Sequence, residues 1–186
     1  MRCFIEIDLP DTVKSYVIEK VMQIKSASTG YDFRIVKKEN LHVTLAFLGE
    51  IDEKTLEEII KKTSAVAGKF CGFECSLSKI EAFPAKSPRM IWITLNENIA
   101  FSNLYEELKK ALTLENEHAG FKAHITAARL KPDSKAKKAI IIRKTETEPL
   151  KFQVRELKIM KSTLKSDGPE YAVMKSIHLA NRRELA

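Results

Sequence analysis

One short pattern occurs twice in this chain, and both copies lie within apolar stretches that predict β-strands. Residues His42–Leu45 read His-Val-Thr-Leu, and residues His124–Ala127 read His-Ile-Thr-Ala. Side chains at positions i and i+2 of a strand share one face, so the histidine and threonine of each copy project together while the residue between them faces the core. Two copies separated by a little under half of the chain indicate corresponding positions in two lobes.

Strands and helices alternate along the 186 residues without an intervening linker. Apolar and turn residues predict strands at 2–9, 31–36, 41–48, 73–83, 90–95, 121–129, 152–164 and 171–179. Helical spacing predicts helices at 11–26 and 52–67, one beginning at Asn98 or Ser102, and a short one after Pro132. The turn at Ser166–Pro169 predicts a hairpin between the last two strands. This order favours an α/β or α+β sandwich of two half-length lobes.

The composition is that of a globular protein with an anionic partner. Hydrophobic residues make up 44% and charged residues 31%, which argues against a disordered, collagenous or membrane chain. The net charge of +7 favours nucleic acid or a phosphorylated ligand. The three cysteines are too few for a disulfide framework, and charges at Glu6 and Asp8 interrupt any export signal, so we expect a cytoplasmic protein. No stretch approaches the roughly 18 to 20 apolar residues of a membrane helix.

The paired histidines suggest acid–base chemistry at phosphorus. Histidine has an unperturbed pKa near 6.5, so one imidazole can accept a proton from the attacking water or hydroxyl while another donates one to the departing oxygen. Thr44 and Thr126 can donate hydrogen bonds to non-bridging phosphate oxygens. These proton transfers need no metal, and Cys71 and Cys75 lack the second ligand pair of a zinc site. We therefore expect neither a metal nor another cofactor.

A plainer interpretation is that the histidines of the pattern are ordinary strand residues with polar neighbours. That interpretation suits the remaining two histidines, His118 and His178, because neither has a threonine two positions later. The occurrence of the pattern twice, in a basic chain, favours the catalytic interpretation for His42 and His124.

At these residues the sequence resembles a known family, the RNA 2′,3′-cyclic phosphodiesterases, formerly called 2′–5′ RNA ligases, of the two-histidine phosphoesterase superfamily. The resemblance covers nearly the whole chain. Its specific segments are Glu39–Gly49 and His124–Arg129, and supporting ones are Arg2–Pro10, Ser162–Leu164 and Tyr171 beyond the turn. Relatives often carry a larger apolar residue at the position of Ala127, the last residue of the second motif, which we expect to face away from the site.

The resemblance implies an α+β fold: a bilobal sandwich of antiparallel-rich sheets with outer helices, a pseudo-twofold axis and a central cleft, formed by residues 1–186 as one two-lobe domain. It implies the opening of a 2′,3′-cyclic phosphate at an RNA 3′ end to a 2′-phosphomonoester, together with a reversible ligation that forms a 2′–5′ linkage. By motif position, His42 resembles the proton donor to the leaving 3′ oxygen and His124 the base that activates water. The two sites are locally alike, so these roles come from the resemblance alone.

Further substrate-binding residues are implied. Arg129 resembles the phosphate-binding arginine of the family, and Ser162 and Tyr171 stand at supporting positions. Strict alternation along the strand would point Arg129 away from His124, so a bend or the strand end must redirect it.

Aromatic residues and a basic run are candidates for contacts with RNA. Phe4, Tyr31 and Phe47 could stack on a base. Phe47 shares the alternation of Val43 and Leu45, so we expect it in the core; Phe4 is the better cleft candidate. The basic run can guide an RNA backbone or form a solvated helix face; it comprises Lys131, Lys135, Lys137, Lys138, Arg143 and Lys144.

The expected partners are RNA ends that carry a 2′,3′-cyclic phosphate, including tRNA halves, or small cyclic nucleotides, and a monomer is the default expectation. Three rival interpretations stay open. The chain could be a non-catalytic RNA-binding module whose His-Thr pairs grip phosphate, a ligase acting chiefly on tRNA halves, or a basic α/β protein of unrelated function.

Overall fold

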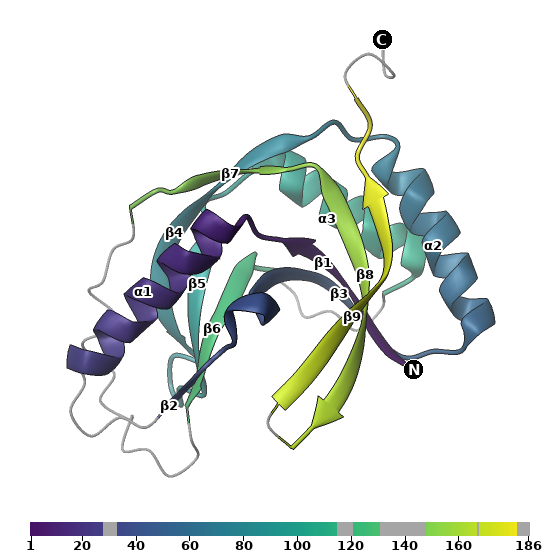
Figure 1. The fold of residues 1–186 in the computed structure, drawn as a ribbon. Coiled ribbons are helices and arrows are strands. Elements are labelled where there is room, and N and C mark those ends of the chain that lie inside the picture. The colour runs from purple at the N-terminus through teal and green to yellow at the C-terminus, as the bar shows by residue number, and fades with distance from the viewer. Residues whose placement is uncertain (28–32, 115–120, 131–147, 167, 182–186) are drawn as a thin grey trace.

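The strands and helices follow the apolar periodicity of the sequence, and the strands form one curved antiparallel sheet (Figure 1). The computed structural model describes residues 1–27, 33–114, 121–130, 148–166 and 168–181. The strands are β1 (Arg2–Asp8), β2 (Phe33–Ile35), β3 (His42–Glu50), β4 (Phe73–Phe83), β5 (Met90–Leu95), β6 (His124–Leu130), β7 (Lys151–Val154), β8 (Glu156–Lys165) and β9 (Gly168–His178). The helices are α1 (Asp11–Ala27), the 3₁₀ helix η1 (Lys38–Asn40), α2 (Glu53–Ala67) and α3 (Ile99–Leu112).

Capping residues determine where the helices begin. The Asp52 side chain accepts a hydrogen bond from the backbone N–H of Thr55 at the start of α2. The Asn98 side chain does the same for Phe101 at the start of α3, so this helix begins after Asn98 and not after Ser102. Such caps satisfy backbone donors that have no partner within the helix.

The strand order is symmetric about the junction of β3 and β6. It runs β7-β4-β5-β6-β3-β1-β8-β9, so β3 and β6 each begin a series of four strands on one side of the junction. The two halves meet where Val43 of β3 pairs with Ile125 of β6. Helix α1 packs against β2 and β6 in one half of the sheet, whereas α2 packs against α3 and against β9 in the other half (Figure 1). The expected α+β class is confirmed.

One predicted strand is divided. The stretch expected as a single strand from 152 to 164 forms β7 and β8, which are separated by Arg155. Strand β7 pairs with β4 and β8 pairs with β1, so the chain crosses here from one half of the sheet to the other. The final hairpin of β8 and β9 is confirmed. The short helix expected after Pro132 lies outside the described residues.

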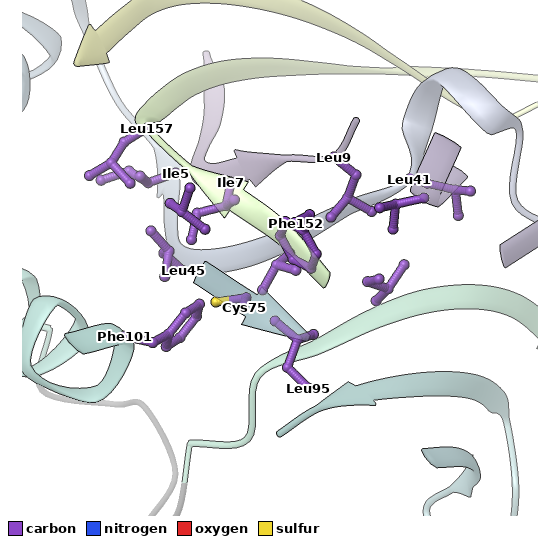
Figure 2. Packing of buried hydrophobic residues seen from close by; sticks show 14 of the residues in the cluster. Ile5, Ile7, Leu9, Leu41, Leu45, Cys75, Leu95, Phe101, Phe152 and Leu157 are labelled. Atoms are coloured by element: carbon purple, nitrogen blue, oxygen red, sulfur yellow. The ribbon is translucent and has the colours of Figure 1, made fainter. Parts of the chain in front are cut away.

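Buried side chains from both halves belong to one hydrophobic cluster. Figure 2 shows part of it, where side chains from the two halves of the sheet and from α3 lie close together: Ile5, Ile7, Leu45, Cys75, Leu95, Phe101, Phe152 and Leu157. The intervening residues of both motifs, Val43 and Ile125, are fully buried in the same cluster, as the strand alternation predicts. Within the described residues, no helix is both long and apolar enough to cross a membrane.

Candidate active site

The two motif histidines are held by the same backbone contact. Nδ1 of His42 lies 2.8 Å from the carbonyl oxygen of Asn40, and Nδ1 of His124 lies 2.8 Å from the carbonyl oxygen of Lys122. A carbonyl oxygen can only accept, so Nδ1 carries the proton in each neutral imidazole and Nε2 is the atom that can take up another. Nε2 of His42 is also 3.0 Å from Oγ1 of Thr44.

The carbonyl that orients His42 is itself fixed by the final hairpin. The side-chain amide of Asn40 donates a hydrogen bond of 3.0 Å to the carbonyl oxygen of Pro169, near the start of β9. Asn40 ends the 3₁₀ helix directly before β3. The hairpin and the first motif are therefore connected through one residue.

A β-bulge follows the first motif. Consecutive residues of β1, Ile5 and Glu6, pair with Ala46 and Thr44 of β3, so Leu45 is the extra residue on β3. Both Leu45 and Ala46 are buried. An extra residue reverses the alternation of side chains beyond it.

A second bulge stands at the same place after the second motif. Ile91 and Trp92 of β5 pair with Ala128 and Thr126 of β6, so Ala127 is the extra residue. Ala127 and Ala128 are both fully buried, and Ala127 does face away from the site as expected. The two halves thus share the bulge as well as the motif.

The bulges redirect the fifth residue after each histidine. In the first half this residue is Phe47 and in the second it is Arg129, and both line the same cleft as the histidines. Strict alternation would point Arg129 away from His124, and the bulge is what turns its side chain toward the cleft. For Phe47 the sequence-based expectation of core packing is wrong, since its relative exposure is 69%. The core prediction assumed that side chains alternate between the two faces of the strand from Val43 to Phe47. The bulge at Leu45 interrupts that alternation, so Phe47 lies on the other face.

The cleft has a volume of about 420 Å³ and brings together eight of the residues that the sequence proposed for catalysis or substrate binding. These residues are Phe4, His42, Thr44, His124, Thr126, Arg129, Ser162 and Tyr171. Ser162 and Tyr171 are cross-strand partners on β8 and β9. Residues from β1, β3, β6 and the final hairpin therefore converge on one site.

Phe4 forms part of the cleft wall and is only 4% exposed. Its ring centroid lies 5.1 Å from that of His42 and 4.9 Å from that of Tyr171, the latter in an edge-on arrangement. Such contacts support the orientation of the imidazole. Phe4 thus offers much less open surface for stacking than Phe47 does.

The cleft is lined by more cationic side chains than Arg129, the one that the sequence indicated. Arg2, Arg34 and Lys37 contribute to it together with Arg129. Arg34 reaches the final hairpin, because a Cβ at Gly168 would lie 3.3 Å from its guanidinium nitrogen. Gly168 also has φ +129°, a conformation that favours glycine. No sequence pattern pointed to Arg34, because only the pairing of β2 with β6 brings its strand to the cleft. Arg2 and Leu164 stood within supporting segments of the family resemblance, but the sequence indicated a role for neither.

The surroundings of the two imidazoles differ. Behind His42, Oε2 of the buried Glu6 lies 3.5 Å from Nδ1. Beside His124, the Trp92 ring is stacked at 3.6 Å, and Phe83 stacks on Trp92 at 3.6 Å. Burial lowers the pKa of His42 from 6.5 to about 4 and also lowers the pKa of His124. Burial raises the pKa of Glu6 from 4.5 to about 7.

Other sequence candidates lie away from the cleft or outside the described residues. His178 is exposed and lies 3.6 Å from Glu156. His118, Tyr31 and the basic run from 131 to 144 fall in segments that the structure does not describe. Across the described ranges, no group of three or more His, Cys, Asp or Glu side chains could hold a metal ion.

Comparison with known proteins agrees with this arrangement. Residues 7–92 match the family described as LigT like Phosphoesterase. An RNA 2′,3′-cyclic phosphodiesterase of Thermotoga maritima is 35% identical, over 94% of this chain and 93% of that protein. The chain belongs to the LigT-like phosphoesterase family.

Solved structures share the fold over nearly the whole chain. A structure from Thermus thermophilus superposes with a TM-score of 0.82 at 27% identity and covers 98% of this chain and 100% of that one. The E. coli LigT complexed with 3′-AMP has a TM-score of 0.71 at 25% identity, covering 97% of this chain and 98% of that one. The fold is thus that of a LigT-like phosphoesterase.

Proposed function

We propose that this protein hydrolyses the 2′,3′-cyclic phosphate at an RNA 3′ end and leaves a 2′-phosphomonoester. The observation that carries the proposal is the matched pair His42 and His124, each with Nδ1 bonded to a backbone carbonyl and each lining one cationic cleft. Family membership and the Thermotoga relative, named an RNA 2′,3′-cyclic phosphodiesterase, support the same reaction.

The proposed reaction is an in-line displacement at phosphorus. The oxygen of a water molecule forms a bond to phosphorus as Nε2 of His124 accepts one of its protons. The bond from phosphorus to the ribose 3′ oxygen breaks, and Nε2 of protonated His42 donates a proton to that oxygen. The phosphate remains on the 2′ oxygen, and the 3′ position becomes a hydroxyl group.

The remaining side chains of the cleft bind the substrate. Thr44, Thr126 and Arg129 would hold the non-bridging oxygens, where negative charge increases as the new bond forms. Phe47 offers an exposed ring on which a base can stack. The E. coli LigT structure with 3′-AMP shows that a protein of this fold binds a nucleotide, which supports a nucleotide ligand here. Both proton transfers come from protein side chains, so we propose that the reaction needs no metal ion.

The test is hydrolysis of an oligonucleotide that ends in a 2′,3′-cyclic phosphate, in excess chelator, with the product resolved as 2′- or 3′-phosphate. We expect the 2′-phosphate. His42→Ala and His124→Ala should each lower kcat by about 10²–10⁴-fold. His178→Ala is the matched control, because this histidine is 78% exposed and does not line the cleft.

Three other results would favour different functions. Tight RNA binding without any opening of the cyclic end would favour a binding module. A 2′–5′ joint formed from paired tRNA halves would favour ligation, in which a 5′-hydroxyl group replaces the water. Full activity in both alanine variants would contradict the paired-histidine mechanism.

A further inference from the structure

We propose that Glu6 is a positioning residue that gives the two histidines different roles: its carboxylate favours the protonated form of His42, which then acts as the acid and leaves His124 as the base. This inference rests on the proposed hydrolysis. It deepens that proposal, because the two motifs are alike in sequence and in their backbone contacts and so do not by themselves distinguish acid from base.

The two halves of the sheet differ in the residue that pairs with the motif threonine. Glu6 pairs with Thr44 across β1 and β3, directly beside the bulge. At the corresponding place in the other half, Trp92 pairs with Thr126 across β5 and β6, also beside the bulge. One motif therefore has a carboxylate as its cross-strand neighbour, and the other has an indole ring.

Glu6 is directed toward His42 and sheltered from solvent. Only 4% of the residue is exposed, and its Oε2 lies 3.5 Å from Nδ1 of His42. A negative charge at this distance, away from bulk water, stabilises an imidazolium strongly. His124 has the stacked face of Trp92 at 3.6 Å instead.

The other charged groups around Glu6 are largely paired with one another. Asp8, on the same strand, lies 2.7 Å from Nζ of Lys14 on α1 and 2.6 Å from Nζ of Lys158 on β8. Lys158 is the cross-strand partner of Glu6 and also lies 3.5 Å from Glu156. From β9 the Tyr171 hydroxyl faces the same region, and burial raises its pKa.

Glu6 is buried and lies 3.5 Å from Nδ1 of His42, so the charge on either group affects the protonation of the other. Burial raises the pKa of Glu6 to about 7 and lowers that of His42 to about 4, because removal from water disfavours the charged form of each group. The two forms with one proton are a neutral carboxyl beside a neutral imidazole, and a carboxylate beside an imidazolium. Two interacting groups of this kind titrate as a pair.

The form with an imidazolium is the one that donates. As the bond from phosphorus to the 3′ oxygen breaks, the Nε2–H bond of His42 also breaks and the proton forms the new O–H bond. The carboxylate of Glu6 stays ionised and the imidazole becomes neutral. His124 has meanwhile gained the proton of the attacking water, and exchange with solvent restores both histidines for the next turnover.

The experiment is the pH dependence of kcat/KM for an oligonucleotide ending in a 2′,3′-cyclic phosphate, measured for the unmodified protein and for Glu6→Gln. We expect a bell-shaped profile in the unmodified protein, with a basic limb where the pair loses its proton. Glu6→Gln keeps the size of the side chain and removes the charge, so the basic limb should move to lower pH by about one unit or more. Activity at pH 8 should then fall at least about tenfold, and less at pH 5.5.

Two variants serve as controls. Glu6→Asp retains the carboxylate and should restore part of the basic limb. Glu81→Gln removes a carboxylate from the half that contains His124, where Glu81 lies 2.6 Å from Nζ of Lys122. It should leave the basic limb in place.

If Glu6→Gln lost the same fraction of activity at every pH, the inference would be overturned, because loss of packing alone does not shift the basic limb of the pH profile. Unchanged activity at every pH would overturn it as well. If Glu6→Gln does not fold, a nuclear magnetic resonance titration of the unmodified protein decides. The Glu6 carboxyl and the His42 ring should titrate with a common midpoint, and independent titration of Glu6 near 4.5 would overturn the inference. If the unmodified protein does not open the cyclic phosphate, the proposed function fails, and the titration still tests the shared proton.

Discussion

The half of the sheet that contains His42 and the half that contains His124 share a backbone plan and differ in the side chains behind the imidazole. Each histidine is bonded through Nδ1 to the carbonyl two residues before it. Each motif is followed by a β-bulge, and the bulge turns Phe47 in one half and Arg129 in the other into the cleft. The backbone plan explains why the two histidines line the same cleft.

The differences lie at the cross-strand positions. The residues opposite the threonines are Glu6 and Trp92, and those opposite the histidines are Asp8 and Thr94. The half with His42 therefore has carboxylates at both positions, whereas the half with His124 has none. In the proposed mechanism, the repeated backbone places the two reacting groups, and the strands beside them supply the electrostatic environment that would distinguish an acid from a base.

The largest expected effect is a difference between the His42 and His124 variants on a substrate whose leaving group needs no proton. A 4-nitrophenolate leaving group needs little protonation near neutral pH, so thymidine 3′-(4-nitrophenyl phosphate) should depend on the base and hardly on the acid. We expect His124→Ala to lose about 10²–10⁴-fold in kcat on this ester and His42→Ala to lose far less. Release of 4-nitrophenolate, followed by absorbance, measures both. Equal losses in the two variants would remove the distinction between the halves.

The next largest effects are expected at Arg129 and Phe47, the fifth residues after the two histidines. Arg129→Ala removes charged hydrogen bonds to phosphate, so kcat/KM should fall by about 10–100-fold on every substrate. Phe47→Ala removes only a stacking surface, so KM for a nucleotide substrate should rise by about 5–50-fold with kcat little changed. Met22→Ala is a suitable control, because Met22 is an exposed apolar residue on α1 that does not line the cleft. A fall in kcat without a rise in KM for Phe47→Ala would contradict the stacking role.

The smallest effect concerns the pH dependence of stability. Glu6 has a folded pKa above its unfolded value, so its contribution to stability decreases as pH rises from 4.5 to about 7. His42 has a folded pKa below its unfolded value, so its contribution increases as pH rises from about 4 to 6.5. Between pH 4.5 and 6.5 the two slopes oppose each other in the unmodified protein.

Glutamine does not titrate, so in Glu6→Gln only the contribution of His42 to the pH dependence of stability remains. Relative to the unmodified protein, the free energy of unfolding of this variant should increase with pH by up to about 1.4 kcal/mol per pH unit in that window. Urea unfolding followed by circular dichroism at several pH values measures the difference. Parallel curves for the two proteins would mean that the pKa of Glu6 is not raised in the folded state.

Much of the fold follows from local patterns in the sequence. The strands at 73–83 and 90–95 coincide with β4 and β5, because each is bounded by turn residues and carries a buried apolar face. The division of 152–164 into β7 and β8 could not be predicted, since it arises from pairing with β4 in one part and β1 in the other. Strand partners distant in the chain leave no local signal.

For the site, the sequence alone determined the repeated His-x-Thr pattern, the shared face of each histidine and threonine, and the basic character suited to an anionic substrate. These features depend on strand geometry and composition, which are local properties of the chain. The tertiary structure decided the rest. A bulge exists only where two strands pair out of step, so the direction of Phe47 and Arg129 depends on β1 and β5. The difference between His42 and His124 likewise arises from Glu6 and Trp92, which are distant in sequence from the motifs and meet them only across the sheet.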